Sequence, residues 1–121
     1  MKRHPDLVRR ILLELEEEPY QGQPIPIKMD DYSNDEIVYH VMLLNEAGLI
    51  EAFDLGIGDV SWMPVRLTWS GHEFLDAARD DERWDRAKEA MADQGDGIVF
   101  EVLKELLLDM RRSDFLPRKR R

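Results

Sequence analysis

The chain has 121 residues, of which 43% are hydrophobic and 36% charged, and it carries a formal net charge of −9. This length fits one domain, and the composition is that of a globular protein rather than of a disordered or membrane-spanning chain. The absence of cysteine excludes disulfides, thiolate catalysis and cysteine-ligated metal centres. The longest apolar run, 41–44, has four residues, whereas a transmembrane helix needs about 20. Because the first residues do not resemble a secretory signal either, we expect a cytoplasmic protein.

The charge is distributed unevenly along the chain. Residues 1–10 carry four basic and one acidic side chain, and residues 111–121 carry six basic and one acidic. The body between them, 11–110, carries 24 acidic and seven basic side chains, a net charge of −17. Such a body repels polyanions over most of its surface, whereas its two basic ends suit contacts with phosphate.

The first segment predicts a helix followed by a proline-rich connection. Pro5 suits a first helical position, and Pro19 ends the helix. Between them, apolar residues recur at three- and four-residue steps and predict one buried stripe: Leu7, Val8, Ile11, Leu12 and Leu15. Residues 19–32 contain three prolines and predict at most a short edge strand at 25–29.

The second helix has the clearest start signal in the chain. Ser33 and Glu36 fit the S-x-x-E capping box, in which each side chain accepts a hydrogen bond from the other's backbone amide. Gly48 marks the end, because glycine adopts the left-handed conformation most easily. The buried face is predicted to comprise Ile37, Val41 and Leu44.

Two strands are expected next, at 49–55 and 60–69, joined by a hairpin connection at 56–59. Pro64 lies inside the second strand and requires an edge position or a bulge there. The alternation of the second strand predicts one shared face for Met63, Val65 and Leu67.

The last part of the chain predicts further helices. Ser70 and Glu73 form a second S-x-x-E pattern, with Trp69 and Phe74 placed for a hydrophobic staple. This helix either continues to about residue 93 or breaks at 80–81, and a heptad-like spacing of apolar residues favours one helix. A final helix at 98–112 is apolar over a wide surface, which suggests packing against the body or against a second copy of the chain in a homodimer.

These elements predict an α+β fold that is mostly helical: helices with a small antiparallel hairpin or three-stranded sheet, followed by C-terminal helices. We expect a core at 1–80, a helical extension at 81–112 and a basic tail at 113–121.

The element order and two short motifs resemble a winged helix-turn-helix domain. The motifs are Gly48-Leu49-Ile50, after the second helix, and Leu67-Thr68-Trp69-Ser70-Gly71, at the end of the hairpin. This resemblance implies that the second helix is the recognition helix and that the hairpin is the wing.

A closer resemblance covers most of residues 1–110. It rests on the opening Met1-Lys2-Arg3, on Asp6-Leu7-Val8-Arg9, on Tyr39-His40 before Leu43-Leu44, on Gly48-Leu49-Ile50-Glu51-Ala52, and on Leu67-Thr68-Trp69-Ser70-Gly71-His72-Glu73-Phe74-Leu75-Asp76. These segments resemble a family of small bacterial, phage- and prophage-associated proteins known as domain of unknown function 2513. The resemblance implies a fold and a mobile-element setting but no activity.

The recognition helix expected here is unsuited to conventional docking on DNA. No lysine or arginine occurs from residue 29 to 65, a stretch that contains eight aspartates and glutamates. DNA carries about one negative charge per ~1.7 Å, so this face favours a protein target. The predicted protein-binding residues are Asp31, Asn34, Asp35, Val38, Tyr39, Met42, Asp54, Ile57, Asp59 and Trp62.

The main alternative is a DNA-binding transcriptional regulator that uses the basic ends and dimerises through the helix at 98–112. It would bind duplex DNA with a steep salt dependence. Its candidate residues are Lys2, Arg3, Arg9, Arg10, Arg111, Arg112, Arg118, Lys119, Arg120 and Arg121.

No motif supports catalysis, a cofactor or a metal. His4, His40 and His72 lack the spacing of paired metal ligands, and His40 is more consistent with a partly buried polar residue. The glycines at 56 and 58 are not followed by the lysine of a phosphate loop. An enzyme is retained as a third hypothesis only because carboxylates are abundant. The leading hypothesis is a non-enzymatic protein-binding protein, in one version an inhibitor whose acidic body occupies the nucleic-acid groove of a host protein.

Overall fold

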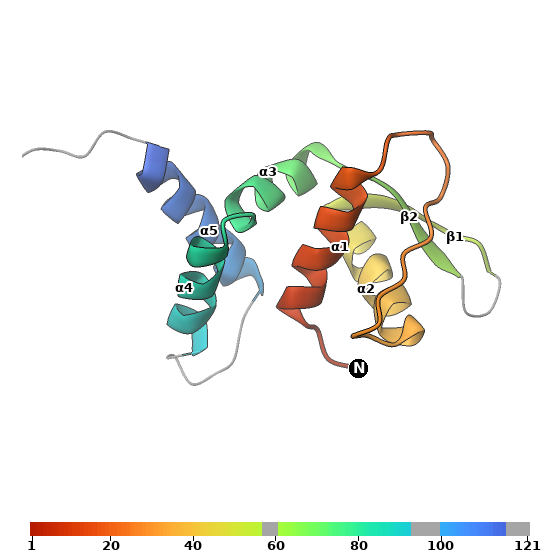
Figure 1. Ribbon diagram of the computed structural model, residues 1–121, viewed down its shortest axis with the longest axis horizontal. Coiled ribbons are helices and arrows are strands. Elements are labelled where there is room, and N and C mark those ends of the chain that lie inside the picture. The colour runs from red at the N-terminus through yellow and green to blue at the C-terminus, as the bar shows by residue number, and fades with distance from the viewer. Residues whose placement is uncertain (57–60, 93–99, 116–121) are drawn as a thin grey trace, which may run out of the picture. The chain divides into compact units, whose positions relative to one another are not determined.

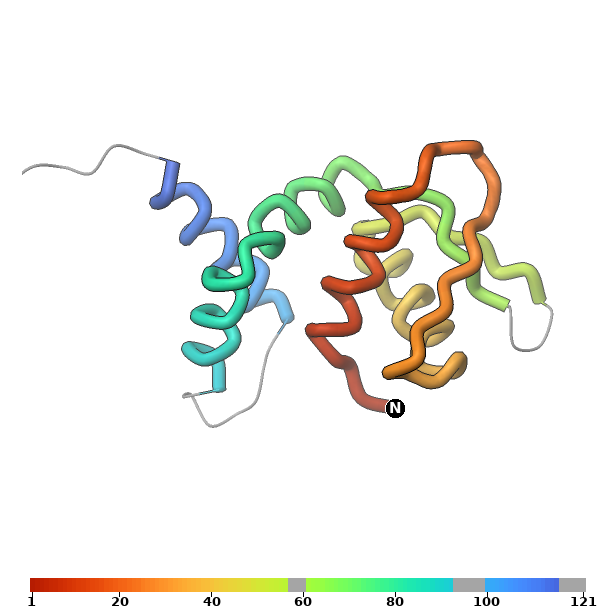
Figure 2. The backbone as a smooth tube through the Cα atoms, viewed as in Figure 1, coloured from red at the N-terminus to blue at the C-terminus, as the bar shows by residue number. Residues whose placement is uncertain are grey.

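The computed structural model describes residues 1–56, 61–92 and 100–115, and within them the predicted α+β class is confirmed. Helices dominate, and the described residues also form one antiparallel sheet of two strands (Figures 1 and 2). In chain order the elements are α1 (Pro5–Glu17), α2 (Asn34–Glu46), β1 (Ile50–Asp54), β2 (Trp62–Leu67), α3 (Trp69–Ala78), α4 (Asp81–Ala92) and α5 (Phe100–Phe115). The chain forms two compact units, Met1–Glu73 and Phe74–Arg121. No helix in the described ranges is long and apolar enough to cross a membrane.

In the first unit, α1 packs against α2 and β2, and α2 packs against both strands. The predicted stripe of α1 is buried in full, and the helix ends at Glu17, before Pro19. The predicted face of α2 is buried as well. Its capping box is present: the Glu36 amide donates to Ser33 Oγ at 3.1 Å, and the Ser33 amide donates to Glu36 Oε1 at 3.1 Å. Both helices are therefore positioned by signals that are local in the sequence.

The sheet contains the irregularity that Pro64 requires. Glu51 pairs with Arg66 and Ala52 with Pro64, so Val65 is the extra residue of a β-bulge. The bulge interrupts the predicted alternation, because Pro64 and Val65 are both buried whereas Met63 is only half-buried.

The expected third strand at 25–29 is not formed. This segment makes one backbone hydrogen bond to β2, from Ile25 N to Pro64 O at 2.7 Å. Pro24 and Pro26 on either side of Ile25 have no N–H group, so the ladder cannot continue. Among the described residues the sheet therefore has two strands.

The start of α3 differs from the predicted one. Thr68, rather than Ser70, caps the helix: Gly71 N donates to Thr68 Oγ1 at 3.1 Å, and His72 N donates to Thr68 O at 3.0 Å. The Thr68 hydroxyl is held in place because it donates to Gly48 O at 2.6 Å. Trp69 is 80% exposed, so the predicted staple with the fully buried Phe74 is wrong.

Of the two alternatives left open for residues 71–93, the break is the one that forms: α3 ends at Ala78 and α4 begins at Asp81, against the continuity that the apolar spacing favoured. Asp80 caps α4 by accepting a hydrogen bond from Arg83 N at 2.8 Å. This bond holds the pKa of Asp80 below its usual value of 3.8. α5 extends to Phe115, beyond the predicted end at 112, and its expected start at 98 lies outside the described residues.

In the second unit, one buried arginine connects α4 to α3 and to α5. Arg83 is 8% exposed; it donates from Nη1 to Ala77 O at 3.0 Å, and from Nε and Nη2 to Asp114 Oδ2 at 3.1 and 2.8 Å. The rings of Phe74 and Phe100 lie 5.3 Å apart between their centroids. Contacts near both ends of α5 therefore connect it to α3 and α4.

Candidate protein-binding surface on helix α2

Helix α2 carries five of the ten residues predicted to bind a protein. Asp35, Val38 and Met42 follow one another at three- and four-residue steps and so lie along one side of the helix. Asp35 is exposed, whereas Val38, Tyr39 and Met42 are half-buried. This side therefore combines an acidic N-terminal end with apolar side chains that remain partly accessible.

A small hollow opens next to this side of α2. It has a volume of about 60 Å³ and lies between α2, strand β2 and the extended segment before α2. It brings together three predicted residues that are distant in sequence or separated by a turn of helix: Asn34, Val38 and Trp62. The other lining residues are mostly apolar: Pro26, Ile27, Lys28, Ile37, Val41, Met63 and Pro64.

Exposed aspartates adjoin two of the residues that line the hollow. Asp35 follows Asn34 in α2, and Asp54 pairs with Trp62 across the sheet. The one charged residue of the lining itself is the cation Lys28. Asp31 is engaged elsewhere, because its carboxylate lies 2.8 Å from the guanidinium of Arg10. The hollow is thus a mostly apolar site with exposed aspartates next to Asn34 and Trp62. Ile57 and Asp59, also predicted here, lie outside the described residues.

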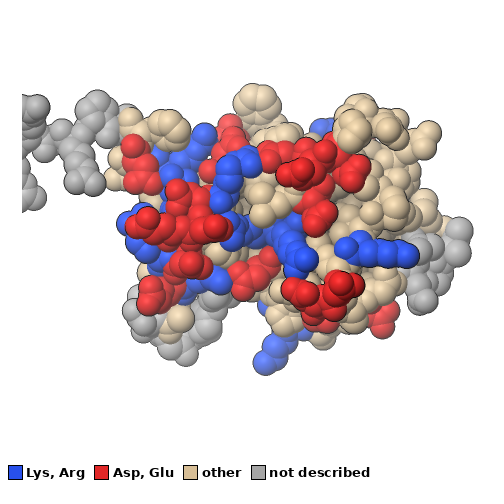
Figure 3. Space-filling model, viewed as in Figure 1, with Lys and Arg blue, Asp and Glu red and all other residues tan. Residues whose placement is uncertain are grey.

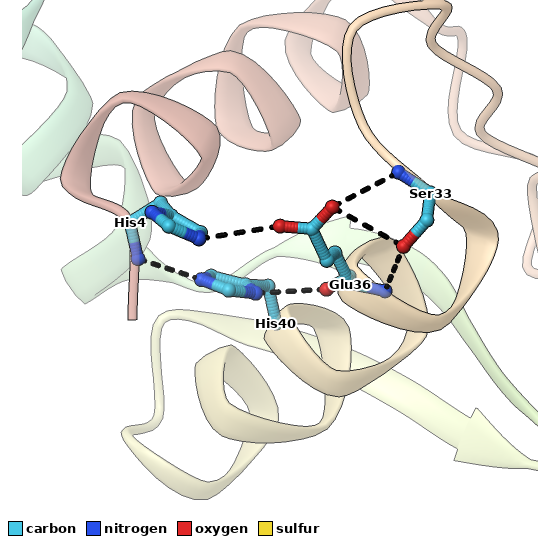
Figure 4. A network of polar contacts seen from close by, with 4 residues as sticks. All are labelled: His4, Ser33, Glu36 and His40. Atoms are coloured by element: carbon cyan, nitrogen blue, oxygen red, sulfur yellow. Dashed lines mark hydrogen bonds and ion pairs between the residues drawn. The ribbon is translucent and has the colours of Figure 1, made fainter. Parts of the chain in front are cut away.

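A polar network fixes the N-terminal half of α2 against the start of α1 (Figure 4). His40 is fully buried; its Nε2 accepts a hydrogen bond from the His4 amide at 2.9 Å, and its Nδ1 lies 2.8 Å from Glu36 O. His4 Nε2 lies 3.2 Å from Glu36 Oε2. Figure 4 shows the Glu36 carboxylate between His4 and Ser33, with the two imidazole rings lying over each other.

The surroundings of His40 and Glu36 in this network determine the protonation states of both side chains. A carbonyl can only accept, so His40 carries its proton on Nδ1 and leaves Nε2 free to accept from His4. Burial lowers the pKa of His40 from its usual 6.5, because a charged imidazole loses its hydration there. The hydrogen bond from the Ser33 amide lowers the pKa of Glu36, which favours its carboxylate form. The sequence indicated a partly buried His40 but carried no signal for its partner.

The basic residues proposed for DNA are partly engaged within the chain. Besides the pair of Arg10 with Asp31, Arg111 lies 3.8 Å from Asp76 and stacks over the Phe115 ring. Arg112 lies 3.8 Å from Asp109. Lys2 and Arg3 are exposed, Arg9 is half-buried, and the four basic residues at 118–121 lie outside the described ranges. In Figure 3 acidic and basic side chains alternate on the visible face of each unit, without a separate basic patch among the described residues.

A larger hollow of about 320 Å³ was not expected from the sequence. It lies where the end of α1, strand β2 and the first turn of α3 meet, and it is lined by Leu15, Glu16, Glu18, Tyr20, Val65, Arg66, Leu67 and His72. Its residues come from three separate segments, so no local spacing could indicate it. In the described part of the chain no group of histidines and carboxylates is arranged to hold a metal ion.

Comparison with known proteins identifies the family. A family model described as "Hypothetical protein (DUF2513)" matches residues 2–97. A protein of Haemophilus influenzae with the name "Uncharacterized protein" is 35% identical over 108 residues, which cover 88% of this chain and 92% of that relative. No solved structure matches the chain. The resemblance to domain of unknown function 2513 is confirmed, and the chain belongs to the DUF2513 family.

Proposed function

We propose that this chain is a non-enzymatic binding protein whose α2 side and adjoining hollow bind a basic segment of another protein. One observation carries the proposal: Val38 and Trp62 line one mostly apolar hollow, and exposed aspartates stand next to two of its lining residues, Asp35 after Asn34 and Asp54 opposite Trp62. Apolar side chains give a protein interface its affinity, and charges of opposite sign on the partner give orientation and specificity.

The size of the hollow favours an aliphatic anchor on the partner. A cavity of about 150 Å³ holds a benzene ring, whereas this hollow has about 60 Å³. A branched aliphatic side chain, with lysine or arginine beside it, complements the hollow and its neighbours Asp35 and Asp54. A nucleic acid is disfavoured at the same place, because its phosphates would approach these carboxylates.

The proposal includes three finer points. The order of helices and hairpin in the first unit supports a winged-helix-like fold, in which α2 takes the place of a recognition helix. The acidic composition supports the version in which the protein occupies the nucleic-acid groove of a host protein in a phage or prophage setting. The site of action in this proposal is the bacterial cytoplasm, where such a groove is accessible.

Site-specific photo-crosslinking tests the proposal, because it captures whichever protein contacts the chosen side chain. A photoreactive amino acid replaces Met42 on α2 or, as a control, the exposed Glu89 on α4. We expect a discrete protein adduct from position 42 in bacterial cells and none of the same mass from position 89. The adduct should decrease about tenfold or more with Asp35→Lys, because a like charge then faces the basic partner.

Asp85→Lys is the matched control for this charge change, because Asp85 is an exposed acidic residue on α4. It should leave the adduct unchanged. Equal loss of the adduct with both variants would indicate a nonspecific charge effect and contradict the proposal. Binding of duplex DNA at low salt that survives Asp35→Lys and requires Lys2 and Arg3 would support the regulator instead.

A further inference from the structure

The contacts between His4 and His40 depend on protonation. His40 Nε2 accepts the His4 amide at 2.9 Å, and this bond exists only while Nε2 carries no proton. His4 is also the N-cap residue of α1, and its carbonyl accepts from Val8 N at 3.1 Å. One buried imidazole therefore connects the beginning of α1 to the middle of α2.

We propose that His40 is a pH-sensitive latch: protonation of its imidazole releases the start of α1 from α2 and loosens the α2 side. This inference rests on the proposed function only in identifying the loosened surface with the binding surface. Histidine suits this role because its charge changes near neutral pH.

Burial opposes a charged His40 ring more than its neighbours favour one, so the pKa is lowered. The backbone carbonyl and the carboxylate of Glu36 favour the charged ring, but that carboxylate also lies 3.2 Å from His4 Nε2 and accepts from the Ser33 amide. The imidazole of His4 is stacked on His40, with centroids 5.7 Å apart and planes 12° from parallel, so two protonated rings would repel each other. The ring of Tyr39 meets His40 edge-on at 6.0 Å, and Tyr32 lies 6.2 Å from His4.

The latch is coupled to the α2 side through two contacts. Tyr39, one of the predicted binding residues, packs against the ring that becomes protonated. Glu36 both binds His4 and completes the capping box that fixes the first turn of α2, where Asn34 and Asp35 lie. Loss of the His4–His40 bond therefore affects both the first turn of α2, which carries Asp35, and the aromatic side chain of Tyr39.

The direction of the pH response follows from the lowered pKa of His40. The folded chain binds the proton at His40 less readily than the unfolded chain does. The contribution of His40 to stability is therefore complete above the unfolded value of about 6.5 and is lost as the pH falls through the lower, folded value. The latch is therefore closed at neutral pH and opens as the pH falls through the lowered pKa of His40.

An NMR titration of the full chain, with ¹⁵N-labelled imidazoles, tests the latch. At pH 7.5 we expect His40 as the Nδ1–H tautomer, with a titration midpoint below 6.5. The amide signals of His4, Val8 and Tyr39 should move with the same midpoint as the His40 ring. The exposed His72 is the internal reference, and these amides should not follow its ring signals.

Two glutamine variants complete the test. His4→Gln keeps the backbone N–H donor but removes the stacked imidazole, so the His40 midpoint should rise, whereas His72→Gln should leave it unchanged. An Nε2–H tautomer of His40 at pH 7.5, or a midpoint at or above 6.5 with unmoved His4 and Tyr39 amides, would overturn the inference. No partner is present in this experiment, so its outcome is independent of whether the α2 side binds a protein.

Discussion

Thr68 shows how one hydroxyl can determine where a helix begins. Its hydroxyl donates to Gly48 O and accepts from Gly71 N, so it connects the turn after α2 to the start of α3. We predict that Thr68→Ala lowers the free energy of unfolding by about 1 kcal/mol, as loss of an N-cap does. Ser70→Ala should change it by only a few tenths of that, because Ser70 is exposed within the helix. Urea-induced unfolding of both variants compares them, and an equal loss would restore Ser70 as the cap.

Gly71 is required by a close approach of the backbone. A Cβ atom at this position would lie 1.9 Å from Leu49 O, a distance that no side chain can accommodate. We predict that Gly71→Ala destabilises the protein by about 1–3 kcal/mol, because the helix start and the turn after α2 must separate. Thermal unfolding followed by circular dichroism measures the change. A melting temperature within the error of that of Ser70→Ala would show that the two segments are not in contact.

At the scale of elements, local signals were reliable where no distant group competed with them. The capping box of Ser33, the proline start of α1 and the bulge at Pro64 could all be read from neighbouring residues, and each is present. The same S-x-x-E pattern failed at Ser70, because the Thr68 hydroxyl is already held by Gly48 O and caps the helix two residues earlier. A capping pattern alone cannot reveal such a competing contact.

The break between α3 and α4 was one of two alternatives that the sequence left open, and a heptad-like spacing of apolar residues favoured the other. Phe74, Ala77, Trp84 and Met91 follow that spacing and are all buried, although the helix is interrupted. Such a spacing indicates which residues are buried but not whether the helix is continuous. The contact that decides for the break is the cap by Asp80 on Arg83 N.

Arg83 is the residue on which the arrangement of α3, α4 and α5 depends most. We predict that Arg83→Met lowers the free energy of unfolding by about 2 kcal/mol, since the aliphatic stem is kept while the bonds to Ala77 O and Asp114 are lost. The value is below that for a fully buried pair, because the Asp114 side chain is 50% exposed and can be hydrated. Arg86→Met, at an exposed position of α4, is the matched control and should have little effect.

A double-mutant cycle with Asp114→Asn separates the ion pair from packing. If the pair accounts for the loss, Asp114→Asn should have a much smaller effect in the Arg83→Met background than in the native chain. Additive losses would mean that Arg83 acts mainly through its aliphatic stem.

At the scale of the whole molecule, the sequence identified the acidic side of α2 but not the hollow beside it. The charge pattern and the helix period were sufficient to select Asp35, Val38 and Met42. The meeting of Val38 and Trp62 depends on the path of the segment at 26–28, which is set by prolines and one hydrogen bond to β2. The ion pair between Arg10 and Asp31 was not foreseen either: it connects a residue expected to bind DNA with one expected to bind a protein. Long-range contacts of this kind have no signature in local spacing.

The central claim is that the chain binds a basic protein segment at α2, and mapping the perturbed surface tests it most directly. The amide and methyl signals of the isotope-labelled chain are recorded with the segment recovered by crosslinking at position 42, and separately with a duplex oligonucleotide at low salt. The account predicts shifts at Asn34, Val38, Met42 and Trp62 with the protein segment and none there with DNA. Shifts confined to Lys2, Arg3 and the arginines of α5 on addition of DNA, with α2 unchanged by the protein segment, would contradict it.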